Sequence, residues 1–311
     1  MVRWDGSSVC KFCFFSDFAR RGRVNNSLSA TDTYVSLLLS MPNLQPATVL
    51  SLFFLTLARV LPIIAIAPFL GAKNIPRVIR MMFSIALVAI FLPQNLMMTT
   101  MDVPFNLTFI GYMAKELLIG TILGFLASVP FYIAQMAGSL IDHQRGASSL
   151  QVSDPTTQSQ TGPVGILYNY VLIAVFFALN GPFIFLDGVA NSYKLIPASG
   201  ILNPALFSLN TVFWKQMVGL FSKMMTLAIQ LASPALIGIL VTDMFLGIAN
   251  RLAPQVQIVF LGISLKSWVG IAMLATAWAL IIKVMGQEAI AWTKNLNQLI
   301  IQVGYYFTKT T

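Results

Sequence analysis

The chain has 311 residues, of which 57% are hydrophobic and only 9% are charged, and its mean hydropathy is +0.79. A soluble domain carries about 25% charged residues, so this composition excludes the soluble globular class. The formal net charge is +9. Apolar stretches longer than the roughly 18 residues that mark a membrane helix recur along the chain. The sequence therefore predicts an all-α, polytopic membrane protein.

Residues 1–44 are expected to form a polar, basic N-terminal extension, because they lack the apolar stripe of a membrane helix. The cations of this segment indicate a flank beside a membrane rather than a nucleic-acid site, since no nucleic-acid-binding motif surrounds them. Cys10 and Cys13 make a single C-x-x-C, which lacks the two further ligands of a structural zinc site. Met41 directly precedes the regular membrane pattern. Two interpretations stay open: a genuine extension, or a start codon assigned upstream of a functional start at Met41.

Six hydrophobic segments follow in chain order, at residues 47–70, 81–98, 107–141, 164–189, 212–248 and 256–284. The third and the fifth exceed the ~20 residues that cross a hydrocarbon core. Each of these two contains a proline, Pro130 or Pro234, which removes a helical hydrogen bond and allows a kink or a break. We expect about six to eight long, kinked helices with helical hairpins. They form an N-terminal region of residues 45–205 and a C-terminal hairpin region of residues 206–311.

Charged side chains lie inside or at the ends of these apolar segments: Arg59, Lys115, Glu116, Asp187, Asp243 and Lys266. One charge at the centre of a bilayer costs about 2.5–3.5 kcal/mol on insertion scales, whereas an apolar residue returns only about 0.3–0.6 kcal/mol. A recurring set of charges therefore predicts helix faces that meet protein or water instead of lipid.

Two pairs among these charges leave alternatives open. Lys115 and Glu116 are neighbours in sequence, so we expect their side chains to point to different helix sectors and not to pair simply. They partner other helices or subunits, or they act as an ion relay. Asp243 and Arg251 flank an expected turn at residues 250–255, and either solvated loop-end charges or a contact site fits them.

Small residues stand out at two places. Gly120 and Gly124 form a G-x-x-x-G, which lets a second helix backbone approach closely. Residues 146–155 are small and polar between two apolar segments. They fit a surface loop, or irregular backbone that lines an aqueous path inside a membrane assembly.

Residue patterns for catalysis are missing from the sequence. It has one histidine, no G-x-S-x-G, no H-E-x-x-H and no phosphate-binding glycine loop. The carboxylates beyond the extension are scattered. We therefore expect no enzyme activity, no cofactor and no metal site.

The order of several short motifs resembles a known family over residues 45–300. The motifs are Arg59 followed by Ala-Ile-Ala-Pro-Phe-Leu-Gly at 65–71, Ile75-Pro-Arg-Val-Ile-Arg80, Lys115-Glu-Leu-Leu-Ile-Gly-Thr-Ile-Leu-Gly-Phe125, Ala137-Gly-Ser-Leu-Ile-Asp-His-Gln-Arg-Gly146, Asp154-Pro155, Leu179-Asn-Gly181, Leu195-Ile-Pro197, Asp243-Met-Phe-Leu-Gly-Ile-Ala-Asn-Arg-Leu-Ala-Pro-Gln255 and Ser264-Leu-Lys266. Together they resemble the T component of the type III secretion export apparatus, whose flagellar counterpart is FliR.

The resemblance implies a non-enzymatic, one-copy subunit of an export gate in the bacterial inner membrane. Its implied partners are R-type and S-type subunits, which surround with it a conduit for unfolded secreted proteins, and the U-type switch protein and V-type gate protein. The C-terminal hairpin resembles the S component. Its turn, with Arg251, Pro254 and Gln255, is implied to face the U component on the cytoplasmic side.

The same resemblance implies that one loop, here named the plug loop, projects into the conduit and helps to close it. Its residues are Gly146, Ala147, Ser148, Ser149, Leu150, Gln151, Val152, Ser153, Asp154 and Pro155. Asp243 and Lys266 favour the virulence-associated injectisome branch over the flagellar branch. The alternative function is a secondary transporter of small solutes, in which intramembrane charges would mark an ion pathway.

Overall fold

A computed structural model of the chain describes residues 46–71, 75–98, 105–146, 152–153, 160–198, 212–252 and 258–308. The expected extension at residues 1–44, with Met41, lies outside the described residues. So do plug-loop residues 147–151, 154 and 155, and Pro254 and Gln255 of the expected hairpin turn.

The described part is almost entirely helical, which confirms the predicted all-α class. In chain order the elements are α3 (Pro46–Ile66), the 3₁₀ helix η1 (Pro68–Leu70), α4 (Arg77–Met98), α5 (Leu107–Gln144), β1 (Val152–Ser153), β2 (Gln160–Thr161), α6 (Pro163–Ala178), α7 (Gly181–Leu195), α8 (Val212–Leu252) and α9 (Ile258–Thr308). The two short strands pair antiparallel, with Val152 opposite Thr161.

Among the described residues, five helices are long and apolar enough to cross a membrane: α3, α4, α5, α8 and α9. The pair α6 and α7 adds a sixth crossing if it is counted as one bent span. This result confirms the prediction of a polytopic helical membrane protein.

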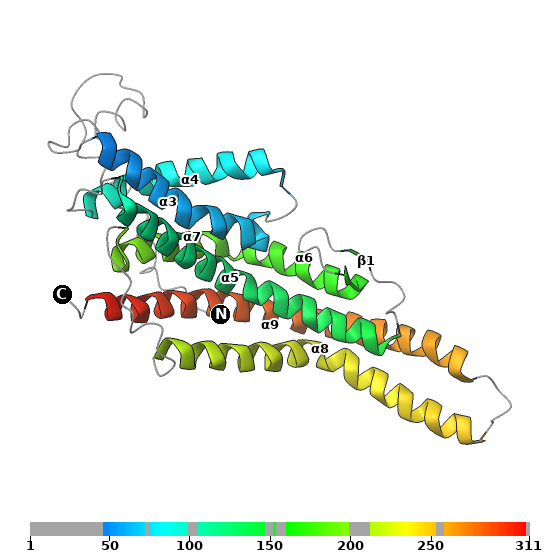
Figure 1. Cartoon of the computed structure of the whole chain (residues 1–311). Helices are drawn as coiled ribbons and strands as arrows, with labels where there is room; N and C mark the ends of the chain where they lie inside the picture. The colour runs from blue at the N-terminus through cyan, green and yellow to red at the C-terminus, as the bar shows by residue number, and fades with distance from the viewer. Residues whose placement is uncertain are drawn as a thin grey trace, which may run out of the picture. The chain divides into compact units, whose positions relative to one another are not determined.

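Helix α5 is the central element of this arrangement. It packs against α3, α6, α8 and α9, and in Figure 1 it runs between the α3–α4 side and the α8–α9 side. In its most apolar window 67% of the residues are buried, against 28% in the corresponding window of α9. The segment that the sequence marked as too long for one simple span is therefore enclosed by other helices.

An aromatic cluster joins the end of α3 to three later helices. Phe69 of η1 contacts the rings of Phe131, Phe176 and Phe185, with centroid distances of 5.7, 5.0 and 5.4 Å. Gly71 closes this 3₁₀ turn at a φ of 81°, a left-handed conformation that suits glycine. The turn thus carries Phe69 into the core between α5, α6 and α7.

The hydrophobic segment expected at residues 164–189 forms two helices, α6 and α7, which are bent by 73°. Asn180 stands at the break with a φ of 57°, and Pro182 follows within the first turn of α7, where proline fits the helix start. The apolar pattern continues through the break, so hydropathy alone does not reveal it. By contrast, α5 and α8 continue through Pro130 and Pro234 as single helices, and α8 changes direction along its length (Figure 1).

The helix of the last hydrophobic segment continues beyond residue 284, since α9 ends at Thr308. Polar residues such as Glu288 and Lys294 lower the hydropathy of this extension. Its buried residues, Ala289, Trp292, Leu296 and Ile300, nevertheless recur at three or four positions, as on one face of a helix. Helix α9 uses this length to pack against α7.

Asn180 offers a test of the bend between α6 and α7. Asn180→Val places a β-branched side chain in the left-handed region, which costs about 1–2 kcal/mol, whereas Asn180→Gly keeps that conformation accessible. We expect the valine variant to lower the thermal unfolding midpoint and the glycine variant to leave it within experimental error. Equal midpoints for the two variants would contradict the left-handed break.

Candidate functional site

A buried ion pair between α3 and α5 is the centre of the candidate site. Arg59 donates from Nε to Glu116 Oε2 at 2.5 Å and from Nη2 to Oε1 at 2.8 Å. Both side chains are fully buried. The guanidinium and the carboxylate thus meet through two parallel bonds, the arrangement in which this pairing is strongest.

The same guanidinium also holds the C-terminal end of α7. Arg59 donates from Nη1 to Ser192 Oγ at 3.1 Å and from Nη2 to the carbonyl oxygen of Ile196 at 2.9 Å. Its Cζ lies 4.1 Å from the ring centroid of Tyr193, within the range of a cation–π contact. One arginine therefore ties α3 to both α5 and α7.

Lys115 completes what we call the internal ion cluster, defined as Arg59, Lys115 and Glu116. Lys115 Nζ lies 2.9 Å from Glu116 Oε1 and donates to the carbonyl oxygens of Pro197 and Ala198, at 2.9 Å each. The expectation that Lys115 and Glu116 do not pair is wrong. They point to different sectors at their Cβ atoms, but the long, flexible lysine stem carries the ammonium back to the neighbouring carboxylate.

The internal ion cluster holds two cations and one carboxylate, so its formal charge is +1. The carbonyl oxygens of Ile196, Pro197 and Ala198 accept hydrogen bonds from the cations just beyond the end of α7. The cluster is thus a polar network with satisfied partners, which is the condition under which buried charge is tolerated. The cluster acts as a structural clamp that holds α3, α5 and the end of α7 together.

Two glycines let α3 come close enough for this clamp. A Cβ atom at Gly120 would overlap the carbonyl oxygen of Arg59, and one at Gly124 would lie 3.1 Å from the Cα of Ile63. Gly120 follows Glu116 by one helical turn. The G-x-x-x-G motif therefore lies where the backbone of α3 crosses α5, next to the ion pair.

A second polar group lies where α5 ends and α6 begins. Asp142 accepts hydrogen bonds from the backbone N–H groups of Val164 at 2.9 Å and Gly165 at 3.3 Å, and it pairs with Arg145. A carboxylate at a helix N-terminus satisfies free N–H groups and matches the positive end of the helix dipole. Asp142 thus joins the two helices that flank the plug loop, a role that the sequence pattern alone did not indicate.

The plug loop is described only at Gly146, Val152 and Ser153. Gly146 follows Arg145 with a φ of 79°, and the ladder pairs Val152 with Thr161 and Ser153 with Gln160. The ladder therefore brings two points of the connection between α5 and α6 side by side.

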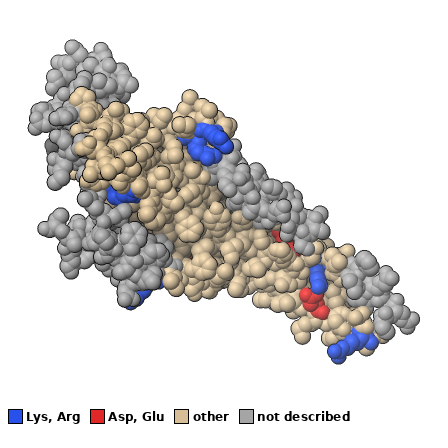
Figure 2. Space-filling model, viewed as in Figure 1, with Lys and Arg blue, Asp and Glu red and all other residues tan. Residues whose placement is uncertain are grey.

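Two ion pairs bridge the hairpin of α8 and α9. Asp243 pairs with Lys266, and Lys223 Nζ lies 3.3 Å from Glu288 Oε2. On the face drawn in Figure 2, charged side chains are sparse; basic and acidic ones lie together at the end where α8 meets α9, and further basic patches lie apart from it. Asp243 is thus bonded within the chain, while Arg251 is exposed near the end of α8. The sequence pattern indicated Asp243 and Lys266 as charges in apolar segments but not their pairing, and it gave no signal for Glu288.

Asp187 does not join either group. It is exposed on α7, and its carboxylate accepts a 3.5 Å hydrogen bond from Asn191. Within the described ranges, no three histidine, cysteine or acidic side chains are grouped to hold a metal ion. The structure therefore brings together Arg59, Lys115 and Glu116, and separately Asp243 and Lys266, but leaves Asp187 apart.

Comparison with known proteins places this architecture in a family context. The sequence profile of the bacterial export proteins, family 1, matches residues 50–290, which confirms the resemblance read from the motifs. The chain is 31% identical to the Yop proteins translocation protein T of Yersinia pestis over 153 residues, 49% of this chain and 57% of that protein. It is 30% identical to the secretion system apparatus protein SsaT of Salmonella typhimurium over 213 residues, 68% of this chain and 79% of that protein. It is 27% identical to the flagellar biosynthetic protein FliR of Bacillus subtilis over 258 residues, 81% of this chain and 95% of that protein.

The match with the Yersinia protein thus covers less than two thirds of that protein's length. The matches with the Salmonella and Bacillus proteins cover more than three quarters of theirs.

Replacing Glu116 tests the internal ion cluster. Glu116→Gln keeps the shape but leaves the charges of Arg59 and Lys115 without a counter-ion, and breaking a buried pair costs about 3–5 kcal/mol. Asp187→Asn is the matched control, because Asp187 is exposed, and its effect should stay within about 0.5 kcal/mol. Thermal unfolding in detergent measures the stability of both variants. Equal losses of stability would contradict the clamp.

Replacing two different glycines of α5 by alanine should change the stability of the protein in opposite directions. Gly120→Ala would push a methyl group against the α3 backbone, which costs about 1–3 kcal/mol. Gly111→Ala on the same helix meets no atom within 4 Å, so the better helix former should stabilise by about 0.5–1 kcal/mol. Unfolding midpoints of the two variants should therefore shift in opposite directions. A stabilising Gly120→Ala would rule out the close crossing of α3 and α5.

Proposed function

This chain belongs to the bacterial export proteins, family 1, and from this premise we propose that it is the T subunit of a type III export gate. The family consists of non-enzymatic, multi-pass membrane proteins of the bacterial export apparatus. In the proposed role, the chain forms with R-type and S-type subunits the inner-membrane conduit through which unfolded proteins are exported. The observation that carries this proposal is the family match over residues 50–290, which reaches from α3 into α9.

The exposed surfaces of the helices support assembly with other subunits. Only 39% of the most apolar window of α8 and 28% of that of α9 are buried within the chain. Large side chains such as Met244, Phe245 and Trp268 are more than 60% exposed. Exposed apolar faces of this extent fit contacts with lipid or with partner helices. We assign R-type and S-type subunits to these faces, and the U-type and V-type proteins to the cytoplasmic side.

We propose the injectisome branch on the basis of Asp243 and Lys266. Relatives from both branches share similar identity with the chain, 31% for the Yersinia protein and 27% for the Bacillus flagellar protein. Overall identity therefore does not separate the branches, and the two charged residues carry this part of the proposal. Their ion pair across the hairpin gives them a joint structural role.

We propose that the plug loop closes the conduit. Support comes from the surroundings of the loop: Asp142 joins the end of α5 to the start of α6, and the β1–β2 ladder pairs Val152 and Ser153 of the loop with Thr161 and Gln160. Small side chains suit a plug because they pack tightly and yet offer little obstruction when the loop moves aside. These bonds would return the loop to the same place after each passage.

The alternative function, a small-solute secondary transporter, requires intramembrane charges that line an ion path. Arg59, Lys115 and Glu116 instead bond to one another and to carbonyl groups inside the chain. This enclosure supports a structural role for the charges over a relay.

Shortening the plug loop tests the proposal. Removal of residues 147–151, with Gly146 and β1 retained, should leave assembly intact and make the gate leak ions in membranes. The matched control removes residues 201–205 from the connection between α7 and α8. Two measurements are needed: co-purification with R-type and S-type subunits, and ion flux across the membrane.

The two readouts separate the parts of the proposal. Absence of R-type and S-type subunits from complexes isolated through the intact chain would overturn the gate function. Normal co-purification with unchanged ion flux in the shortened variant would overturn the plug assignment alone.

A further inference from the structure

Pro130 leaves one backbone carbonyl group in the middle of α5 without its helical hydrogen bond. A proline inside a helix has no N–H to give to the carbonyl group four residues earlier, which here is that of Leu126. Leu126 is only 3% exposed, and α5 is a candidate membrane span. Water does not reach a carbonyl group at such a place, so another part of the protein must supply the hydrogen bond.

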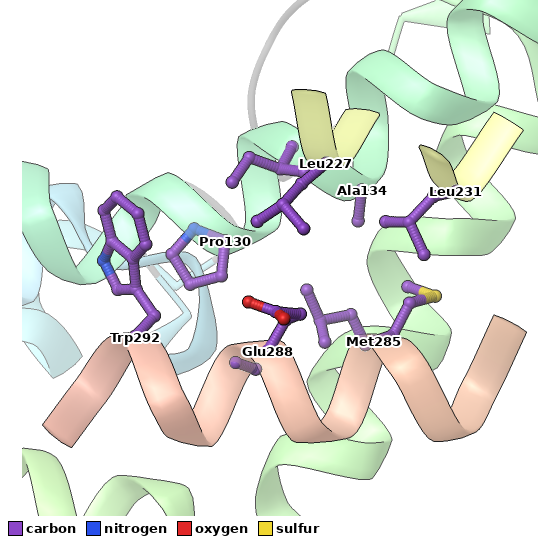
Figure 3. Close-up of a pocket in the computed structure, with 10 residues that line it drawn as sticks. Pro130, Ala134, Leu227, Leu231, Met285, Glu288 and Trp292 are labelled. Atoms are coloured by element: carbon purple, nitrogen blue, oxygen red, sulfur yellow. The ribbon is translucent and has the colours of Figure 1, made fainter. Parts of the chain in front are cut away.

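The donor comes from α9, far away in the sequence. Trp292 donates from its indole Nε1 to the carbonyl oxygen of Leu126 at 2.8 Å, across 166 residues. Trp292 is itself 4% exposed. Figure 3 shows its ring beside Pro130, at a cavity that Pro130 and Trp292 line together. The bond therefore satisfies two buried groups at once, the freed carbonyl and the indole N–H.

We infer that Trp292 is the positioning residue that sets where the C-terminal hairpin docks on α5. Apolar contacts alone fix position weakly in a membrane, because lipid and neighbouring side chains are equally apolar. A hydrogen bond has a narrow range of distance and angle, so it selects one register. The inference concerns contacts within the chain and holds whether or not the proposed function is correct.

The helix packing around this bond agrees with a docking point. Ala289, one turn before Trp292 on α9, and Ala134, one turn after Pro130 on α5, are each 1% exposed. Both line the same cavity, and their small side chains let the two helices approach. The indole thus forms its bond where close contact is sterically possible.

Pro234 of α8 shows why the arrangement at Pro130 is informative. The corresponding carbonyl group there is that of Gln230, which accepts a hydrogen bond from Ser233 Oγ at 2.8 Å. The carbonyl group that Pro234 leaves free thus accepts a hydrogen bond from within its own helix, so it needs no donor from a neighbouring helix. The proline of α5 depends instead on a residue of the hairpin.

A double-mutant cycle tests the inference in the full chain in native membranes. The reporter is Ala289→Cys in a Cys10→Ser, Cys13→Ser background, and its rate of alkylation by a membrane-permeant reagent measures opening of the α5–α9 contact. Trp292→Phe should raise this rate about fivefold, as expected for one membrane hydrogen bond. In a Pro130→Ala background the residue at 130 regains its N–H and satisfies Leu126 itself. There, Trp292→Phe should change the rate less than about twofold.

The cycle separates the hydrogen bond from ring volume, because the smaller phenylalanine ring costs the same in both backgrounds. Trp278→Phe is the matched control on the same helix. Trp278 packs against Tyr168 with centroids 6.3 Å apart, so its effect should be equal in the two backgrounds. Equal effects of Trp292→Phe with Pro130 present and in the Pro130→Ala background would overturn the inference.

A second substitution covers the case in which Pro130→Ala does not accumulate. Incorporation of 3-benzothienylalanine at position 292 replaces the indole N–H by sulfur and keeps the ring shape. It should accelerate alkylation in the Pro130 background nearly as much as phenylalanine does. An unchanged rate would show that the N–H is not what holds the hairpin on α5.

Discussion

Polar groups inside a membrane must find partners within the protein, and this constraint governs the structure. The bidentate bond between Arg59 and Glu116 meets this constraint directly, because both side chains are fully buried and bond to each other. Neither charge would be tolerable alone in so buried a place. The pair requires α3 to lie directly on α5, and Gly120 permits that approach by having no side chain. The rest of the N-terminal region is arranged around this crossing.

The same constraint recurs along α5 with different chemistry. Lys115 bonds to backbone carbonyls after α7, Trp292 bonds to the carbonyl that Pro130 leaves free, and Asp142 bonds to the N–H groups that begin α6. Each of these contacts joins α5 to a different part of the chain. The central helix is therefore held by polar bonds of fixed geometry along its length, while apolar packing fills the space between them.

These contacts suggest how a membrane protein without catalytic residues serves an export apparatus. Polar bonds hold the body of the chain rigid, whereas the outer faces of α8 and α9 remain apolar and open to other helices or lipid. Asp142 joins the two helices on either side of the α5–α6 connection, and the β1–β2 ladder pairs two points within it. Under the proposed function, these bonds hold the surroundings of the plug loop in place.

The sequence by itself determined the class of the protein, because hydropathy and length decide whether a helix can cross a membrane. Ordered motifs also identified the family, and the charges at Arg59, Lys115 and Glu116 were visible as anomalies in apolar segments. Only the tertiary structure decided how they pair. Hydropathy also concealed the break at Asn180 and the full length of α9, because it averages over residues and does not register backbone angles or an amphipathic face. Partners such as Leu126 and Trp292 are distant in sequence, and a hydrogen bond between distant residues exists only once the helices are packed.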